Sequence, residues 1–175
     1  MNRTGALIGN AVRIFTAAIG VWATSFAAFG EPPPSGAVAT VTQLYHDYAW
    51  QVVIEEPTNV GIDLFDQPAE VLSRYFDQHM VELIVRDRQC RDRTHEVCRL
   101  DYAPIWDSQD PGARDMKIRA TPDPSKVAVD FIYQGDSSRM HITYVLSKTR
   151  EGWRIADIQG STGSLSKVLE SALHP

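Results

Sequence analysis

Three aspartates within ten residues are the strongest candidates for chemistry in this sequence. Asp101, Asp107 and Asp110 lie in the segment LDYAPIWDSQD. Grouped carboxylates can bind a cation or supply the acid and base of a proton-transfer reaction. The alternative, which we favour, is that Asp101 and Asp110 hold turns, as aspartate commonly does. The segment still supplies the candidate ligand or partner contacts, with no catalytic residue assigned: Asp101, Tyr102, Trp106, Asp107, Gln109 and Asp110.

Cys90 and Cys98 are the only two cysteines in the chain. In an oxidising compartment a lone pair at this short spacing predicts a disulfide. Continuous helix would separate their Cα atoms by about 12 Å, whereas a disulfide needs about 4.4–6.8 Å. The chain must therefore turn back between Arg91 and Val97. A metal site using both thiolates and His95 is the alternative, but structural zinc takes four ligands and no fourth is evident. We therefore expect no metal.

The five histidines are scattered, and no two have the i, i+4 spacing of metal ligands. His46 and Asp47 could form half of a catalytic triad, but neighbouring residues on a helix are expected to point apart. His79 falls on an apolar helical stripe, which predicts a buried, hydrogen-bonded side chain. The segment Gly160–Ser164 could bind an anion ahead of a helix, but a turn with Ser164 as N-cap is favoured. No nucleophile elbow or phosphate loop is present, and no cofactor is expected.

The first thirty residues have the pattern of a secretory signal peptide. Met1–Arg13 carries two arginines and no acidic residue, and Ile14–Phe29 is almost wholly small or apolar. This apolar stretch is shorter than the ~20 residues of a comfortable bilayer span. An uncleaved N-terminal anchor is the alternative. Cleavage after either Ala27 or Gly30 satisfies the small-residue rule, so the position of the cut stays open.

The expected organisation is a signal peptide over residues 1–30, a proline-rich linker over 31–36 and one exported domain over 37–175. The leader carries two of the 17 basic residues and none of the 22 acidic ones, so the remainder has 15 basic and 22 acidic residues and a formal charge of −7. An acidic surface argues against nucleic acid or an anionic membrane as a partner. We expect no stable membrane anchor after cleavage, and a periplasmic location in a Gram-negative cell.

Two helices are expected in the first half of the domain. Apolar residues recur at helical spacing over Ala37–Val53. Ile54–Asp66, which contains proline, asparagine and glycine, is expected to be a loop. Pro68 suits the first position of a second helix, which we expect to run on to about Asp87. Leu100–Gly112 is expected to be irregular.

The second half changes to the period of two that is typical of strands. Four alternating runs are separated by turn signals: Met116–Thr121, Val127–Tyr133, Met140–Leu146 and Trp153–Ile158. In the last run, Trp153, Ile155 and Asp157 are expected to share one face. Ser164–Leu173 closes the chain as a short helix. The fold class is α+β, with N-terminal helices packed on a curved antiparallel sheet of about four strands.

Helices followed by a strand meander with Gly-Trp-Arg-Ile near its end resemble the cone-like fold of the cystatin and nuclear-transport-factor-two type. The segments LDYAPIWDSQD and YVLSKTREGWRIADI, with Ser164-Leu165 after them, resemble a family of small exported proteobacterial domains, domain of unknown function 3828. Asp101, Pro104, Gln109 and Asp110 stand at the positions of that family's Asp-rich motif. The resemblance implies a fold and an exported setting, and it brings no established activity.

Three functions remain open from the sequence. The first is a non-catalytic binding or protein-interaction module of the cell envelope, inhibitor-like or immunity-like, whose partner is an envelope or secreted protein or a small ligand. The second is a small cone-fold isomerase or hydrolase that uses Asp101 or Asp107 with a tyrosine. The third is a structural accessory protein of the envelope. A deep apolar pocket with an inward Asp and Tyr would favour the enzyme, whereas a shallow, filled concavity with an exposed aromatic patch would favour the interaction module.

Overall fold

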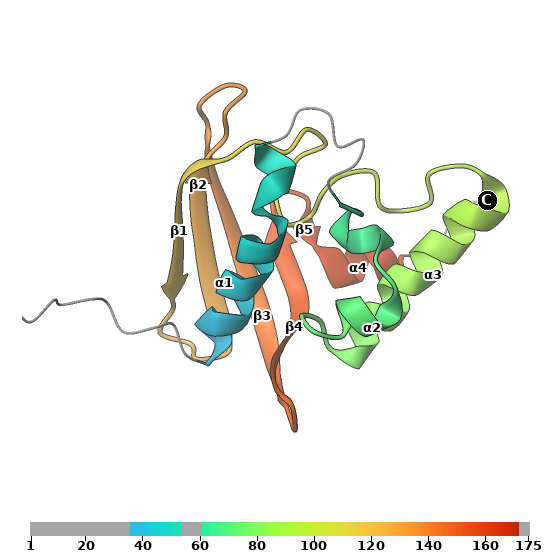
Figure 1. Cartoon of the computed structure of the whole chain (residues 1–175), viewed down its shortest axis with the longest axis horizontal. Coiled ribbons are helices and arrows are strands. Elements are labelled where there is room, and N and C mark those ends of the chain that lie inside the picture. Colours follow the sequence, from blue (N-terminus) through green and yellow to red (C-terminus); the bar gives the residue numbers. More distant parts are fainter. Residues whose placement is uncertain (1–35, 54–60, 172–175) are drawn as a thin grey trace, which may run out of the picture. The chain divides into compact units, whose positions relative to one another are not determined.

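A five-stranded antiparallel sheet organises the computed structural model (Figure 1). The structure describes residues 36–53 and 61–171, so the expected signal peptide and nearly all of the linker lie outside it. Each strand pairs with the next along the chain, which makes the sheet a simple meander. The strands are β1 (Arg114–Ala120), β2 (Lys126–Ile132), β3 (Arg139–Thr149), β4 (Gly152–Gly160) and the two-residue β5 (Gly163–Ser164). The predicted α+β class is confirmed, with β5 as an additional short strand.

The predicted alternation of side chains between the core and the opposite face is found in β2 and β3 but not in β4. In β2, Val127, Val129 and Phe131 are all buried. In β4 the partners of Val145 and Leu146 are Asp157 and Ile155, so one extra residue is inserted between them. Such a bulge bends the strand and resets which side chains face the core. The expected regular alternation over Trp153–Ile158 is therefore wrong, since Ile155 and Ile158 are both buried.

Helix α1 (Ala37–Tyr48) packs against this sheet and matches the first predicted helix. Its buried residues follow the expected helical stripe and include Val41, Leu44 and Tyr45. The helix continues as a 3-10 turn over Ala49–Val52. The predicted loop of residues 54–66 lies partly outside the described residues, and its last part, Leu64–Asp66, forms another 3-10 turn.

The predicted second helix is two helices, α2 (Ala69–Leu72) and α3 (Gln78–Thr94). Between them the chain runs alongside β4: Ile155 N donates to Tyr75 O at 2.7 Å, and Asp77 N donates to Ile155 O at 3.0 Å. The Asp77 carboxylate then caps the new helix by accepting from Met80 N at 3.0 Å. These bonds to the sheet replace helical ones, which explains the break. His79, expected to be buried, is exposed and lies 2.9 Å from a Glu170 oxygen, whereas Met80 and Leu83 of the same predicted stripe are buried.

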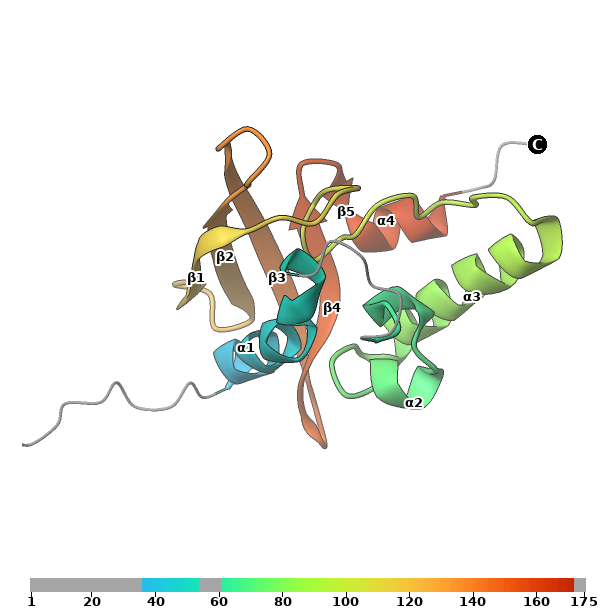
Figure 2. The same cartoon turned by 45° about the horizontal axis from the view of Figure 1, so that its top comes forward.

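Helix α3 continues one turn beyond Cys90 and ends at the left-handed His95, rather than near Asp87 as expected. The chain then turns back, and Cys90 and Cys98 form the predicted disulfide with their Cα atoms 6.1 Å apart. Figures 1 and 2 show α3 on the β4 side of the sheet, with α4 (Leu165–Glu170) beside it. Ser164 is the N-cap of α4, as predicted, and accepts a hydrogen bond from Lys167 N. No helix of the described residues is long and apolar enough to span a bilayer.

Aromatic side chains fill the space between α1 and the sheet. Tyr45 packs edge-on against Trp106 at a centroid distance of 5.2 Å and against Tyr144 at 6.0 Å. Trp106 in turn packs edge-on against Phe131. The Tyr45 hydroxyl donates to the carbonyl of Ile105 at 2.6 Å and accepts from the Tyr144 hydroxyl at 2.9 Å. The space between α1 and the sheet is therefore a packed core, and no buried side-chain nitrogen or oxygen of the described residues lacks a hydrogen-bond partner.

Candidate functional site

The Asp-rich segment is a loop that is pinned to the β4–β5 turn. An Asp107 carboxylate oxygen accepts from Ser161 N at 2.6 Å. The Tyr102 hydroxyl accepts from Thr162 Oγ1 at 2.9 Å. Asp107 has a left-handed backbone, with φ of 49°. Two of the six candidate contact residues thus hold two loops together.

The other four candidates divide between the core and the surface. Trp106 is only 1% exposed, and its Nε1 donates to Gln51 Oε1 at 2.7 Å, so it does not face solvent. Asp101, Gln109 and Asp110 are exposed. Within the described part of the chain neither the Asp101 nor the Asp110 carboxylate accepts a hydrogen bond; Ser108 Oγ makes the turn by accepting from Asp110 N. Among the residues that the structure describes, no three such side chains form a group that could hold a metal ion.

Burial raises the pKa of the Tyr102 phenol, and although the Thr162 hydrogen bond lowers it, the nearby charges of Asp107 and Asp101 raise it further. The phenol is therefore neutral at physiological pH. A tyrosine with a raised pKa is a weak general acid, because proton transfer is most efficient from a group whose pKa lies near the working pH. A neutral phenol can still donate a hydrogen bond, which is the part that the Asp–Tyr hypothesis gives to the tyrosine.

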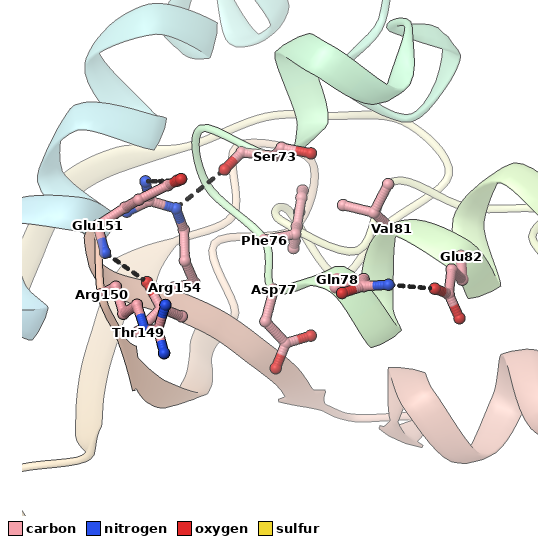
Figure 3. Close-up of a pocket in the computed structure, with 10 residues that line it drawn as sticks. All are labelled: Ser73, Phe76, Asp77, Gln78, Val81, Glu82, Thr149, Arg150, Glu151 and Arg154. Atoms are coloured by element: carbon pink, nitrogen blue, oxygen red, sulfur yellow. Dashed lines mark hydrogen bonds and ion pairs between the residues drawn. The ribbon is translucent and has the colours of Figure 1, made fainter.

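A groove of about 460 Å³ lies elsewhere, between the α2–α3 junction and the β3–β4 hairpin (Figure 3). It is lined by ten residues from these two segments, which lie far apart in the sequence: Ser73, Phe76, Asp77, Gln78, Val81 and Glu82 from the first, and Thr149, Arg150, Glu151 and Arg154 from the second. The groove therefore exists only because the fold brings these two segments together.

The groove combines an apolar floor with fixed polar walls. Phe76 and Val81 are 1% and 8% exposed, and Phe76 packs against Phe65 at a centroid distance of 6.0 Å. The Asp77 carboxylate is held on both oxygens, because it caps α3 and also accepts from Ser147 Oγ at 3.1 Å. Side chains that are held in this way give the floor and one wall a fixed shape.

Two arginines on the hairpin have different roles. Arg154 Nε donates to Ser73 O at 2.9 Å, and its Nη2 lies 3.4 Å from a Glu151 carboxylate oxygen. Arg154 thereby ties the hairpin to the segment opposite. Arg150 is exposed, and no ion pair of its guanidinium is found among residues 36–53 and 61–171. Arg150 is therefore the groove cation that is available to a partner.

Sequence reasoning missed this groove, since none of its lining residues was a candidate. One signal was present: Asp77 immediately precedes an apolar helical stripe, which is a typical N-cap position. The edge pairing of Tyr75–Asp77 with β4 leaves no pattern in the local sequence. The groove could therefore not be placed without the tertiary structure.

The histidines do not gather into a metal site in the described residues, where no group of three potential ligands is found. His46 and Asp47 do not point apart as expected: His46 Nδ1 lies 3.0 Å from an Asp47 oxygen. Both side chains lie on the outer flank of the last turn of α1, where rotation about their side-chain bonds lets them meet.

Comparisons with known proteins leave the family open. No protein-family model and no curated protein matches the chain. A similar solved structure is the phospholipid-binding protein from Ralstonia solanacearum in complex with a phospholipid, which is 16% identical, with a TM-score of 0.43, over 77% of this chain and 83% of that one. This distant likeness assigns neither a ligand nor a function to the present chain.

Proposed function

We propose that this protein is a non-catalytic binding module of the cell envelope, and that the groove between the α2–α3 junction and the β3–β4 hairpin is its binding surface. The observation that carries the proposal is the contrast between the filled space under α1 and this open groove. The space between α1 and the sheet is filled by Tyr45, Trp106, Phe131 and Tyr144, whereas the groove is open, with an apolar floor and a charged rim.

The groove has the anatomy of a protein interface rather than of a catalytic centre. Protein interfaces place apolar side chains at the centre and polar ones at the rim, and arginine is enriched among the residues that contribute most. Here Phe76 and Val81 form the centre, and Arg150, Glu82 and Glu151 stand at the rim. We therefore infer that the partner is a segment of an envelope or secreted protein, which places an apolar side chain on the floor and an acidic one against Arg150.

The disulfide supports an oxidising setting for this module, because such bonds are rare in reducing compartments. Cys90 and Cys98 join the end of α3 to the loop that follows it. The expected export to the periplasm agrees with this bond, and the signal peptide itself lies outside the described residues. Inhibition or immunity is the finer proposal for what binding achieves.

A random-peptide library displayed on phage and selected against the folded protein tests this proposal. The affinity of each enriched peptide is then measured for the wild type, Arg150→Glu and Arg139→Glu. Arg139 is a matched control, since it is also exposed but lies at the other end of β3. We expect Arg150→Glu to weaken binding by about tenfold or more, the effect of reversing one interfacial charge, and Arg139→Glu to leave it unchanged. Peptides that are insensitive to Arg150→Glu would contradict the proposal.

A further inference from the structure

A second, polar cleft lies between α1 and the chain that leaves α2. It has a volume of about 490 Å³ and shares no lining residue with the groove described above. Its walls are mostly polar: Ala39, Thr40, Gln43 and Asp47 from α1, with Arg74 and Tyr75 opposite. A cleft of this volume falls within the range of small-molecule sites, about 300–1,000 Å³.

Asp47 gives the cleft a fixed negative charge. Its carboxylate accepts from the Tyr75 hydroxyl at 2.5 Å and from Gln43 Nε2 at 2.7 Å, and His46 Nδ1 lies at 3.0 Å. Burial raises the pKa of this carboxyl, but the hydrogen bonds, that of Tyr75 first, outweigh burial and hold the pKa below its usual value. A carboxylate has about four acceptor positions, so one remains for a ligand. The side chain is 33% exposed, which leaves it open to the cleft.

Arg74 gives the same cleft a positive charge. Its side chain is exposed, and its charge acts on the Tyr75 phenol. Arg74 and Asp47 line one cleft, yet they form no ion pair with each other, and Arg74 has no other ion-pair partner in the described ranges. Two opposite charges that face one cleft without meeting leave a gap that a ligand with both charges can bridge.

We propose that this cleft binds a small zwitterion of the free α-amino acid class, with its ammonium group on Asp47 and its carboxylate on Arg74. A peptide terminus does not meet this requirement, because it carries only one of the two adjacent charges. The cleft is suited to binding rather than to proton transfer: burial and the bond to Asp47 raise the pKa of the Tyr75 phenol, while the pKa of Asp47 is lowered. Neither group has a pKa near neutrality, where acid–base catalysis is efficient.

Titrating the isotope-labelled protein with each free L-amino acid, and following backbone amide shifts by NMR, tests this proposal. We expect at least one amino acid to shift amides around the cleft. Its N-acetyl and carboxamide derivatives, which each lack one charge, should bind roughly tenfold or more weakly, the loss expected for one charge-assisted hydrogen bond. Amino acids that leave the cleft amides unmoved, or derivatives that bind as well as the parent, would overturn the proposal.

Two variants test the two charged ends of the ligand separately. Asp47→Asn and Arg74→Gln should each weaken binding by roughly tenfold or more, whereas the exposed controls Asp92→Asn and Arg139→Gln should not. If Asp47→Asn fails to fold, Arg74→Gln still decides, because its side chain is exposed. Equal affinity of Arg74→Gln and its control would overturn the proposal, and the groove proposal would be unaffected by that result.

Discussion

Replacing Asp107 by alanine should destabilise the protein strongly, although the residue lies in a surface loop. The change removes a charge-assisted hydrogen bond to Ser161 N, worth about 1.5–3 kcal/mol. It also places alanine in a left-handed conformation that aspartate tolerates better, at a cost of about 1 kcal/mol. Because Asp107 is half-buried, we take a total of about 2–4 kcal/mol. At roughly 3–4 °C per kcal/mol for a domain of this size, the melting temperature should fall by about 6–16 °C.

Two companion variants make this prediction specific. Asp107→Asn keeps a residue that tolerates the left-handed region and can still accept a hydrogen bond, so it should lose only about 1 kcal/mol. Asp101→Asn changes an exposed carboxylate and should stay within about 0.5 kcal/mol of the wild type. Scanning calorimetry of the disulfide-bonded protein measures all three. If Asp101→Asn were as destabilising as Asp107→Ala, the assignment of Asp107 as the residue that holds the two loops would be refuted.

Three other perturbations have defined outcomes. Tyr45→Phe leaves the Ile105 carbonyl and a second buried hydroxyl without a partner, so urea unfolding should show a loss of about 2–4 kcal/mol; a loss below 1 kcal/mol would count against the buried network. Replacing Cys90 and Cys98 by serine opens a short loop and should cost roughly 2–3 kcal/mol, whereas two alkylatable thiols in the unreduced wild type would rule out the bond. Hydrogen bonds from His141 and Arg119 hold the pKa of the Asp130 carboxyl below its ordinary 3.8. The stability that these bonds contribute is therefore present above pH 3.8 and is lost as the pH falls below it. Asp130→Asn should lose less stability on acidification than the wild type, and an equal loss in both proteins would contradict this.

The sheet could be predicted from the sequence because side chains on a strand alternate strictly between two faces. Phe131 and Ile142 are buried where the alternation places them. The disulfide followed from the cysteine count, the short spacing and the expected export, and chain geometry then required the turn after α3. Both depend on local pattern, which a sequence displays directly.

The features that the sequence did not show depend on contacts between distant segments. The break before α3 exists because Tyr75–Asp77 bonds to Ile155, eighty residues further along the chain. That break divides the predicted second helix into α2 and α3. The bulge in β4 likewise shifted the burial of its isoleucines.

The same limit applies to the candidate site. The spacing of Asp101, Asp107 and Asp110 indicated a carboxylate cluster, but only the fold shows that Asp107 is used to hold the β4–β5 turn. The groove and the polar cleft are each lined by residues from two segments that lie far apart in the sequence. No motif marks them, because each lining residue is ordinary in its own sequence context.

The most direct test of the central proposal is an amide shift map of the protein with a peptide selected from the library. The proposal predicts that the largest changes cluster over Ser73–Glu82 and Thr149–Arg154, on the two walls of the groove. Changes centred on the exposed residues of the Asp101–Asp110 loop, or on the outer face of β1 to β3, would contradict it and place the binding surface elsewhere.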